Sequence, residues 1–502
     1  MAKRIIALVM LLCMALPMFV ACGEEKKESV STTSPLFSQN TKEEDPEIAK
    51  VEAYIAELAT EQKASVEGKT FTWIGVGVTD AEEETGDLEE DALYYRQRDL
   101  EDIFGIDWVT AENEGVEGGP HPTFENVRKD VMAGTKAYNV VGGTTAAVCQ
   151  PLFLQGCLAD VSGYEVLDLS QEWWTQSLSD TYQIAGATYF LTGMISRTYF
   201  LDSYCVMFNK QVATDYSIDI NGMYELVKNG EWTFDQFFKI AESVPSNENG
   251  TGAYRFNRPN GTVLMWANNI PITYFDELGN PYVPEELSKE LSDLADKFSA
   301  IFGNDAYTAG VTEKEDINNK YGFKSFSEMF TEEQILFFIE TTGEAAYLRE
   351  ADVNFGILPL PKKDTAQEKY ISYIEPWGAY HVAVPKTTNN EHVTDVMLEA
   401  MGALSLKYLK PAIYDNILKS RSTYDKDSKL MIDLILDGKT YDLVNMLQPD
   451  ESYVRMLNNA ISYSSQSFSS SYRMQGRTMN KKITERIKQI ENGTFDFPNL
   501  IL

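Results

Sequence analysis

A regular alternation of strand-like and helical segments begins near residue 69, and it constrains the fold more than any other feature. Residues 69–78 (KTFTWIGVGV) are rich in aromatic and β-branched side chains, which is typical of a buried strand. The predicted elements that follow are a helix at 87–104, a strand at 106–110, a helix at 127–133 and a strand at 138–141. Gly105 is a suitable C-terminal stop for the first of these helices. Strands that alternate with helices usually form a largely parallel sheet, so this region predicts an α/β lobe.

The segments outside this region are expected to be richer in helix. Apolar residues at helical spacing predict an amphipathic helix at 46–62. In residues 232–238 (WTFDQFF), Thr233 and Gln236 form a capping box at the start of a helix. Further strands are predicted at 354–358 and 381–384, each closed by proline, and residues 394–490 are expected to be mostly helical.

Length and charge limit the classes of function. The chain has 502 residues, which is long enough for two large lobes, and 43% of them are hydrophobic. Its formal net charge is −33 at pH 7. Such a surface repels phosphate backbones, so no nucleic-acid partner is expected.

The N-terminus predicts export. Lys3 and Arg4 precede an uninterrupted apolar run at 5–16, which has the length of a signal-peptide core and is too short for a comfortable membrane span. Residues 19–22 (FVAC) resemble the bacterial lipobox, with Phe19 where leucine is usual. That resemblance implies a signal peptide over residues 1–22 and acylation of Cys22. An ordinary secretory signal with an incidental cysteine is the alternative.

The residues after Cys22 have the composition of a tether. Residues 23–45 are rich in Glu, Lys, Ser and Thr and carry few apolar side chains, so they cannot bury a core. The mature chain is therefore expected to be a folded body held by a flexible linker outside a membrane.

Enzyme and metal motifs are weak in this sequence. Residues 437–440 (DGKT) look like the end of a P-loop, but Asp433 stands where its first glycine is needed. The three histidines lack metal-ligand spacing to one another, and no C-x-x-C pair occurs. Hence no catalytic residue, metal or cofactor is predicted. The body cysteines, Cys149, Cys157 and Cys205, are expected as free buried thiols, although a Cys149–Cys157 bridge is conceivable.

Several ordered segments together resemble the extracellular solute-binding protein family 1, which includes maltose- and oligosaccharide-binding proteins. The resemblance spans roughly residues 69–440, whereas 441–502 match only loosely. The segments that carry it are 92–103 (ALYYRQRDLEDI), 131–139, 142–145 (GGTT), 169–174 (LSQEWW) with a strand pair around 186–191, 206–210 (VMFNK), 224–227, 230–233 (GEWT), 354–362 (NFGILPLPK), 367–373 and 384–386.

The resemblance implies an α/β fold of the type II periplasmic binding proteins, with two discontinuous lobes that close like a Venus flytrap. Matched by order, the hinge crossings fall near 197–204 and 371–380. Lobe 1 would comprise residues 46–200 plus about 371–425. Lobe 2 would comprise residues 201–370 plus about 426–502.

Candidate ligand-binding residues follow from the chemistry of sugars and from the loops that the resemblance places at the cleft. Sugars present hydroxyl groups and flat apolar faces, so a site needs aromatic plates and polar side chains. Near the crossings the candidates are Tyr199, Tyr204, Glu375, Trp377 and Tyr380. Elsewhere they are Asp80, Thr144, Thr145, Trp266, Asn268, Thr342 and Glu344.

For the Thr144–Thr145 pair and for Asp80, the expectation rests on their position at the end of a predicted strand. Thr144 and Thr145 follow a strand, so their backbone N–H groups could point at a ligand, and Asp80 follows the first strand at its carboxyl edge. Trp266 is as well explained by a place in the core. Trp73, Trp173, Trp174 and Trp232 are expected to be packing residues.

Together these features predict an extracytoplasmic, monomeric substrate-binding lipoprotein of an ABC importer. It would bind a carbohydrate between its lobes, deliver it to permease subunits and be anchored to the cell membrane through Cys22. A secreted enzyme acting on polysaccharide and a binding-protein-shaped sensor are the alternatives. The sequence does not name the sugar.

Overall fold

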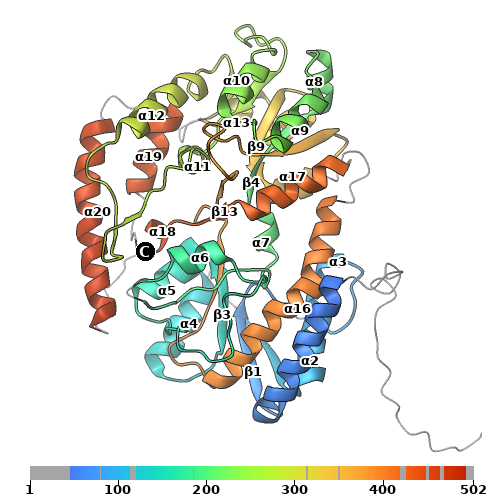
Figure 1. The fold of residues 1–502 in the computed structure, drawn as a ribbon, viewed down its shortest axis with the longest axis vertical. Coiled ribbons are helices and arrows are strands. Elements are labelled where there is room, and N and C mark those ends of the chain that lie inside the picture. Colours follow the sequence, from blue (N-terminus) through green and yellow to red (C-terminus); the bar gives the residue numbers. More distant parts are fainter. Residues whose placement is uncertain are drawn as a thin grey trace, which may run out of the picture. The chain divides into compact units, whose positions relative to one another are not determined.

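The computed structural model describes residues 46–79, 81–113, 120–184, 186–311, 315–348, 351–418, 426–447, 452–463 and 468–492. They form an α/β fold built on two mixed sheets (Figure 1). The first sheet has the order β12-β3-β1-β2, in which β1 pairs in parallel with both β2 and β3, and β12 is antiparallel to β3. Its strands are β1 (Thr70–Gly75), β2 (Asp107–Ala111), β3 (Val140–Thr144) and β12 (Tyr380–Ala383).

The second sheet has the order β10-β4-β9-β5-β8. Strand β4 is antiparallel to both β10 and β9, whereas β5 is parallel to β9 and β8. Its strands are β4 (Tyr204–Asn209), β5 (Tyr254–Asn257), β8 (Thr308–Ala309), β9 (Ile335–Thr341) and β10 (Phe355–Pro359). Two short pairs complete the strands: β6 (Tyr274–Phe275) with β7 (Pro281–Tyr282), and β11 (Ser372–Tyr373) with β13 (Lys439–Thr440).

The helices fall into two groups according to which sheet's strands they neighbour in the sequence. Those nearest in sequence to the first sheet are α2 (Pro46–Val66), α3 (Leu88–Phe104), α4 (Pro122–Ala133), η1 (Thr145–Cys149), α5 (Gln150–Leu154), α6 (Gln176–Thr181) and α16 (Glu391–Leu418). Those between or beside the strands of the second sheet are α7 (Thr198–Leu201), α8 (Lys210–Asp215), α9 (Ile220–Lys228), α10 (Phe234–Ala241), α11 (Gly261–Ala267), α12 (Lys289–Phe302), α13 (Ile317–Tyr321), α14 (Phe326–Thr331) and α15 (Thr342–Leu348).

The last helices that the structure describes are α17 (Lys426–Asp437), α18 (Val444–Leu447), α19 (Ser452–Tyr463) and α20 (Phe468–Glu491). Helix α16 packs along α3 and contacts β1, whereas α17 packs on β10 and α19 packs on α11 and α12. The mostly helical character predicted for residues 394–490 is therefore confirmed wherever the structure describes them. None of the described helices is long and apolar enough to cross a membrane.

Local capping explains where the first helices begin and end. The side chain of Asp87 accepts hydrogen bonds from the N–H groups of Glu89 and Glu90 and so caps α3. Gly105 ends this helix at φ 68, as predicted. Thr233 caps α10 as predicted, by accepting from the N–H of Gln236. The predicted helix at 127–133 begins earlier, because Pro122 occupies its first turn, where a proline is favoured.

One predicted strand is longer than the strand observed, and one predicted strand pair is wrong. Strand β1 ends at Gly75, which has φ +99 and where an added Cβ would lie 2.0 Å from the carbonyl oxygen of Gly142. The predicted strand pair around 186–191 is not formed. Only isolated bridges occur there, from Ile184 to Ala187 and from Leu191 to Val382.

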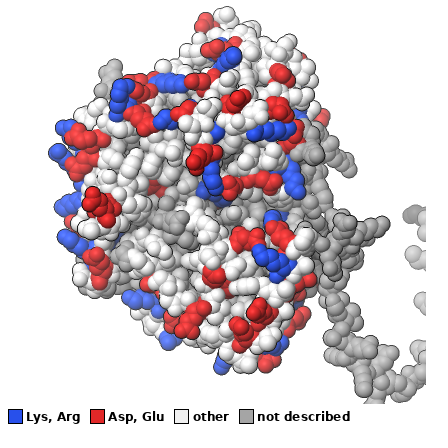
Figure 2. All heavy atoms as spheres, viewed as in Figure 1, with Lys and Arg blue, Asp and Glu red and all other residues white. Residues whose placement is uncertain are grey.

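The core is aromatic-rich and confirms several packing predictions. Trp73, Trp173, Trp174 and Trp232 are all buried. The three body cysteines are buried free thiols, as expected. On the face drawn in Figure 2, acidic and basic side chains are interspersed, which suits a solvated exterior.

Candidate functional site

Short chain segments that run between the two sheets meet side by side. The segment after α7 enters the second sheet at Tyr204, and the segment containing β11 returns the chain to β12. Ser372 of β11 donates a hydrogen bond from Oγ to the carbonyl oxygen of Tyr204 at 3.1 Å. The neighbouring strand β13 pairs in parallel with β11. We call these three segments, residues 202–204, 371–380 and 439–441, the crossing region.

A buried ion pair ties two of the segments together. Nζ of Lys439 contacts the carboxylate of Asp202, and their side chains are only 2% and 4% exposed. The same ammonium group lies 4.4 Å from the ring centre of Tyr199 and contacts its carbonyl oxygen. Burial raises the pKa of Asp202 to about 6 and lowers the pKa of Lys439. Removal from water is thus the dominant electrostatic effect on this pair.

Glu375 is the centre of a hydrogen-bond network that joins three elements. It accepts from the hydroxyl of Tyr204 at 2.7 Å and from Oγ1 of Thr262 at 3.4 Å. The side-chain amide of Asn260, the residue before α11, also donates to it. Burial, and then the charge of Glu375, raise the pKa of Tyr204 well above its ordinary value. The tyrosine therefore stays protonated and acts as a donor.

Two further acidic side chains lie near Glu375. Glu340, at the end of β9, has its pKa raised to about 7 by burial and by the like charges of Glu344 and Glu375. The hydroxyl of Ser327 donates to Glu344. This edge of the second sheet consequently offers several carboxylate acceptors, which suit hydroxyl-bearing ligands.

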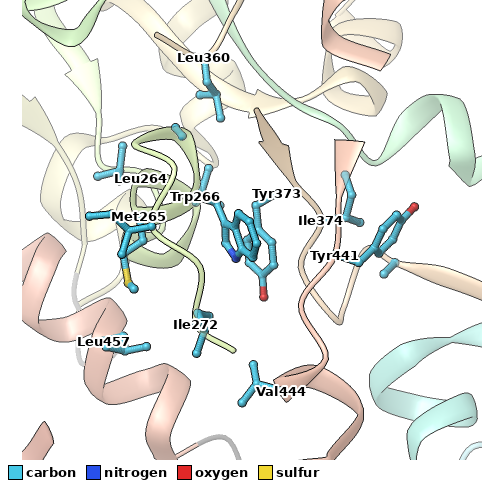
Figure 3. Packing of buried hydrophobic residues seen from close by; sticks show 14 of the residues in the cluster. Leu264, Met265, Trp266, Ile272, Leu360, Tyr373, Ile374, Tyr441, Val444 and Leu457 are labelled. Atoms are coloured by element: carbon cyan, nitrogen blue, oxygen red, sulfur yellow. The ribbon is translucent and has the colours of Figure 1, made fainter. Parts of the chain in front are cut away.

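Two tryptophans proposed as stacking plates differ sharply in exposure. Trp377, in the turn after Glu375, is 64% exposed. Trp266 is only 9% exposed and stacks on Tyr373 with ring centres 5.9 Å apart at 14° (Figure 3). Figure 3 shows this stack enclosed by Ile374, Ile272 and other apolar side chains. Trp266 therefore packs in the core of this structure, whereas Trp377 presents a free apolar surface.

The end of β3 lies against the second crossing segment. Tyr380 pairs with Thr144 across the two strands. The N–H of Thr145 donates to the carbonyl oxygen of Ala379 at 2.8 Å, and Oγ1 of Thr144 accepts from Ala147 at 3.3 Å. The backbone donor of Thr145 is thus already engaged by the crossing segment, so a ligand would have to compete for it.

The loop that precedes Asp80 is held from α3. Arg96 donates to the carbonyl oxygen of Gly77 at 2.5 Å, and it also contacts Ile195 and Ser405. Gln97 exchanges two hydrogen bonds with the backbone of Thr79. Asp80 itself and Cys22 lie outside the described residues.

Two other candidates, Asn268 and Thr342, lie in different surroundings. Asn268 lines a pocket of about 530 Å³ whose apolar walls include Phe234 and Phe298, on the side of α12. Thr342 is fully buried, and its hydroxyl donates to the carbonyl oxygen of Phe200 at 2.7 Å. The side-chain amide of Asn268 donates to the carbonyl oxygen of Leu264 in α11 at 2.7 Å.

Two residues of the crossing region, and Asn260 beside Glu375, were missed by sequence reasoning. Lys439 stands in the DGKT segment that resembles a P-loop end, and Asp202 follows a short helix with no marked motif. Only their contact in the folded chain reveals their role. Asn260, which precedes a glycine and an apolar run, carries a helix-start signal that could have identified it.

A search of solved structures finds similar folds across most of the chain. An ABC substrate-binding protein from Listeria monocytogenes, in complex with cycloalternan, matches with a TM-score of 0.52 and 12% identity. The match covers 83% of this chain and 100% of that one. The apo-form of RafE from Streptococcus pneumoniae matches with a TM-score of 0.52, 13% identity and coverage of 82% and 98%.

A cyclo/maltodextrin-binding protein complexed with maltotetraose matches with a TM-score of 0.54, 13% identity and coverage of 84% and 98%. Neither a protein-family model nor a curated protein sequence matches the chain. At these identities the likeness establishes the fold, which is that of the two-lobed periplasmic binding proteins. The expected resemblance to solute-binding proteins is confirmed at that level.

Proposed function

We propose that the chain is the extracytoplasmic substrate-binding lipoprotein of an ABC importer, and that it binds a carbohydrate between its lobes without altering it chemically. Two of the similar structures are named as binding proteins, one in complex with cycloalternan and one with maltotetraose. These ligands are properties of those proteins. For this chain they support a sugar as the class of ligand to test first.

The observation that carries the proposal is the pairing of Glu375 with Tyr204 beside the exposed Trp377. A carboxylate and a phenol can hydrogen-bond vicinal hydroxyl groups, and an exposed indole can cover the apolar face of a sugar ring. All three side chains belong to the segments that run between the sheets, where a ligand would contact both lobes.

Hinge closure is proposed to occur at the crossing region. The lobe boundaries remain those predicted from the sequence, with lobe 1 at 46–200 plus about 371–425 and lobe 2 at 201–370 plus about 426–502. Closure of two lobes over a small ligand excludes water and lets a few polar groups fix its orientation.

The proposed membrane location and permease partner are argued from the N-terminal sequence, residues 1–45, which precedes the described structure. We propose that Cys22 carries the lipid anchor and that residues 23–45 give the body its reach to permease subunits. In membrane fractions of cells that make the full chain, Cys22→Ser should move the protein to the soluble fraction. Retention of the variant at the membrane would contradict the anchor.

The binding proposal is tested by thermal melting against a panel of mono- and oligosaccharides. A ligand that binds only the folded state raises the melting temperature in proportion to the logarithm of its concentration. At least one carbohydrate should give such a rise, and product analysis should recover it intact. A panel without response, or turnover of the sugar, would contradict the proposal.

A further inference from the structure

The C-terminal helix α20 is fastened firmly to the second-sheet side of the molecule. The side chain of Asn480 exchanges two hydrogen bonds of 2.9 Å with the backbone of Val283. Arg473 also pairs with Glu286. Helix α20 also packs on α19 and contacts β7. This part of α20 therefore moves with the elements that surround the second sheet.

The other end of α20 reaches an element of the first-sheet side. Nη1 of Arg486 donates to the carbonyl oxygen of Leu154, the last residue of α5, at 2.8 Å. Arg486 lies 13 residues after Arg473, which corresponds to about 20 Å along a helix. In Figure 1 the helix extends from beside α12 to beside α5. Carbonyl groups at a helix C-terminus lack partners within the helix and carry partial negative charge, so a guanidinium is well matched to them.

Helix α18 strengthens the same connection. All four of its residues are buried, and it contacts η1 and α5 as well as α20. Gln150, the first residue of α5, donates to the carbonyl oxygen of Asn445 in α18. The hydroxyl of Tyr373 donates to the side-chain oxygen of Asn445 at 3.1 Å. Helices α18 and α20 thus contact elements of both sides of the molecule.

We propose that α18 and α20 form a strap between the lobes, in which Arg486 is a positioning residue that holds the lobe arrangement seen here. The strap rests on the proposed hinge motion but not on the identity of the ligand. Any rotation of the lobes that moves α5 away from α20 must break the Arg486–Leu154 contact. The strap therefore sets how readily the ligand-free protein leaves this arrangement.

The test measures the distribution of lobe–lobe distances in the ligand-free full chain. Fluorophores are introduced through noncanonical amino acids at the exposed positions Met132 and Glu248, so that the native cysteines are untouched. Arg486→Met keeps an apolar stem and removes the donors. Loss of a hydrogen bond from a charged group should raise the population of other arrangements by about ten-fold, and this widens the distribution.

Arg477→Met is the matched control, because it removes an exposed arginine of the same helix whose partner lies on the second-sheet side. It should leave the distribution unchanged, and Arg486→Lys should widen it less than Arg486→Met. If Arg486→Met does not melt cooperatively, the distance distributions of Arg486→Lys and Arg477→Met are compared instead, and a wider distribution for Arg486→Lys supports the strap. Unchanged distributions for the Arg486 variants, or equal widening by Arg477→Met, would overturn the strap. Failure of every sugar to bind would leave this result standing and would count against the proposed function alone.

Discussion

The hydroxyl of Tyr204 donates a 2.7 Å hydrogen bond to Oε2 of Glu375, although 171 residues separate them in sequence. Tyr204 opens the first strand after one crossing, and Glu375 lies within the next. This bond therefore couples the two crossing segments directly. Asn260 and Thr262 also donate hydrogen bonds to Glu375, and they connect the crossing segments to α11 on the second-sheet side.

Replacing Glu375 with glutamine should weaken carbohydrate binding. The amide cannot accept hydrogen bonds at its nitrogen, and hydrogen bonds to a charged group contribute about 1.5–3 kcal/mol, so the dissociation constant should rise by roughly 10- to 100-fold. Titration calorimetry with a sugar found in the melting screen measures this dissociation constant. Glu368→Gln, at an exposed position seven residues before Glu375, is the control and should bind like the unmodified protein. Equal affinity of both variants would remove Glu375 from the site.

The two tryptophans should separate binding from folding. Trp377→Ala should lower sugar affinity with little change in melting temperature, because its indole is largely exposed. Trp266→Ala should cost about 3–5 kcal/mol of unfolding free energy, because it empties a buried stack on Tyr373. Urea denaturation and calorimetry on both variants measure these effects. A stable Trp266→Ala protein that has lost sugar binding would reverse the two assignments.

Breaking the Asp202–Lys439 pair should be costly, whereas replacing it as a whole should not be. Lys439→Met leaves a buried carboxylate without its counter-charge and should lower the unfolding free energy by about 3–5 kcal/mol. The double variant Asp202→Leu, Lys439→Met should recover most of this loss, because no buried charge remains. Urea denaturation of the three proteins gives the comparison. A double variant no more stable than Lys439→Met would show that the pair itself stabilises the crossing region.

Glu399 should make stability depend on pH in a defined window. This buried carboxyl accepts from Tyr54 at 2.9 Å and from the indole of Trp174 at 3.1 Å, and burial raises its pKa to about 7. Between about pH 4.5 and pH 7 the folded protein keeps a proton that the unfolded chain releases. The contribution of Glu399 to the free energy of unfolding is therefore complete below about pH 4.5. About 3 kcal/mol of it is lost as the pH rises through 7.

The measurement is the unfolding free energy in urea at pH 5 and pH 7.5 for Glu399→Gln and for the unmodified chain. The variant lacks the titrating group, so its stability relative to the unmodified protein should increase with pH. Glu57→Gln, at an exposed position of α2, should follow the unmodified protein. Parallel curves for all three proteins would contradict a raised pKa at Glu399.

The sequence predicted the framework well because the relevant signals are local. Asp87 and Gly105 mark the ends of α3 within one helix, and the aromatic run before Gly75 identifies β1 without knowledge of any partner. The missing strand pair near Gly186 shows the limit. Its apolar residues have strand-like composition, but in the fold they contribute only isolated bridges.

The site was less predictable because its contacts join distant segments. Glu375 and Tyr204 were selected from their expected place at the crossings, and the structure brings them together. Lys439 and Asp202 are 237 residues apart, and no local pattern connects them. The environment of Trp266 likewise depends on Tyr373, so periodicity alone could not distinguish a core residue from a binding plate.

Closure of the two lobes on a carbohydrate is the central claim, and small-angle X-ray scattering tests it most directly. The radius of gyration is measured for the chain alone and with a saturating sugar identified in the screen or by mass spectrometry of material that co-purifies. We expect the ligand to reduce the radius of gyration, and the reduction to be lost in Glu375→Gln at the same sugar concentration. An unchanged radius with a bound sugar would contradict the account.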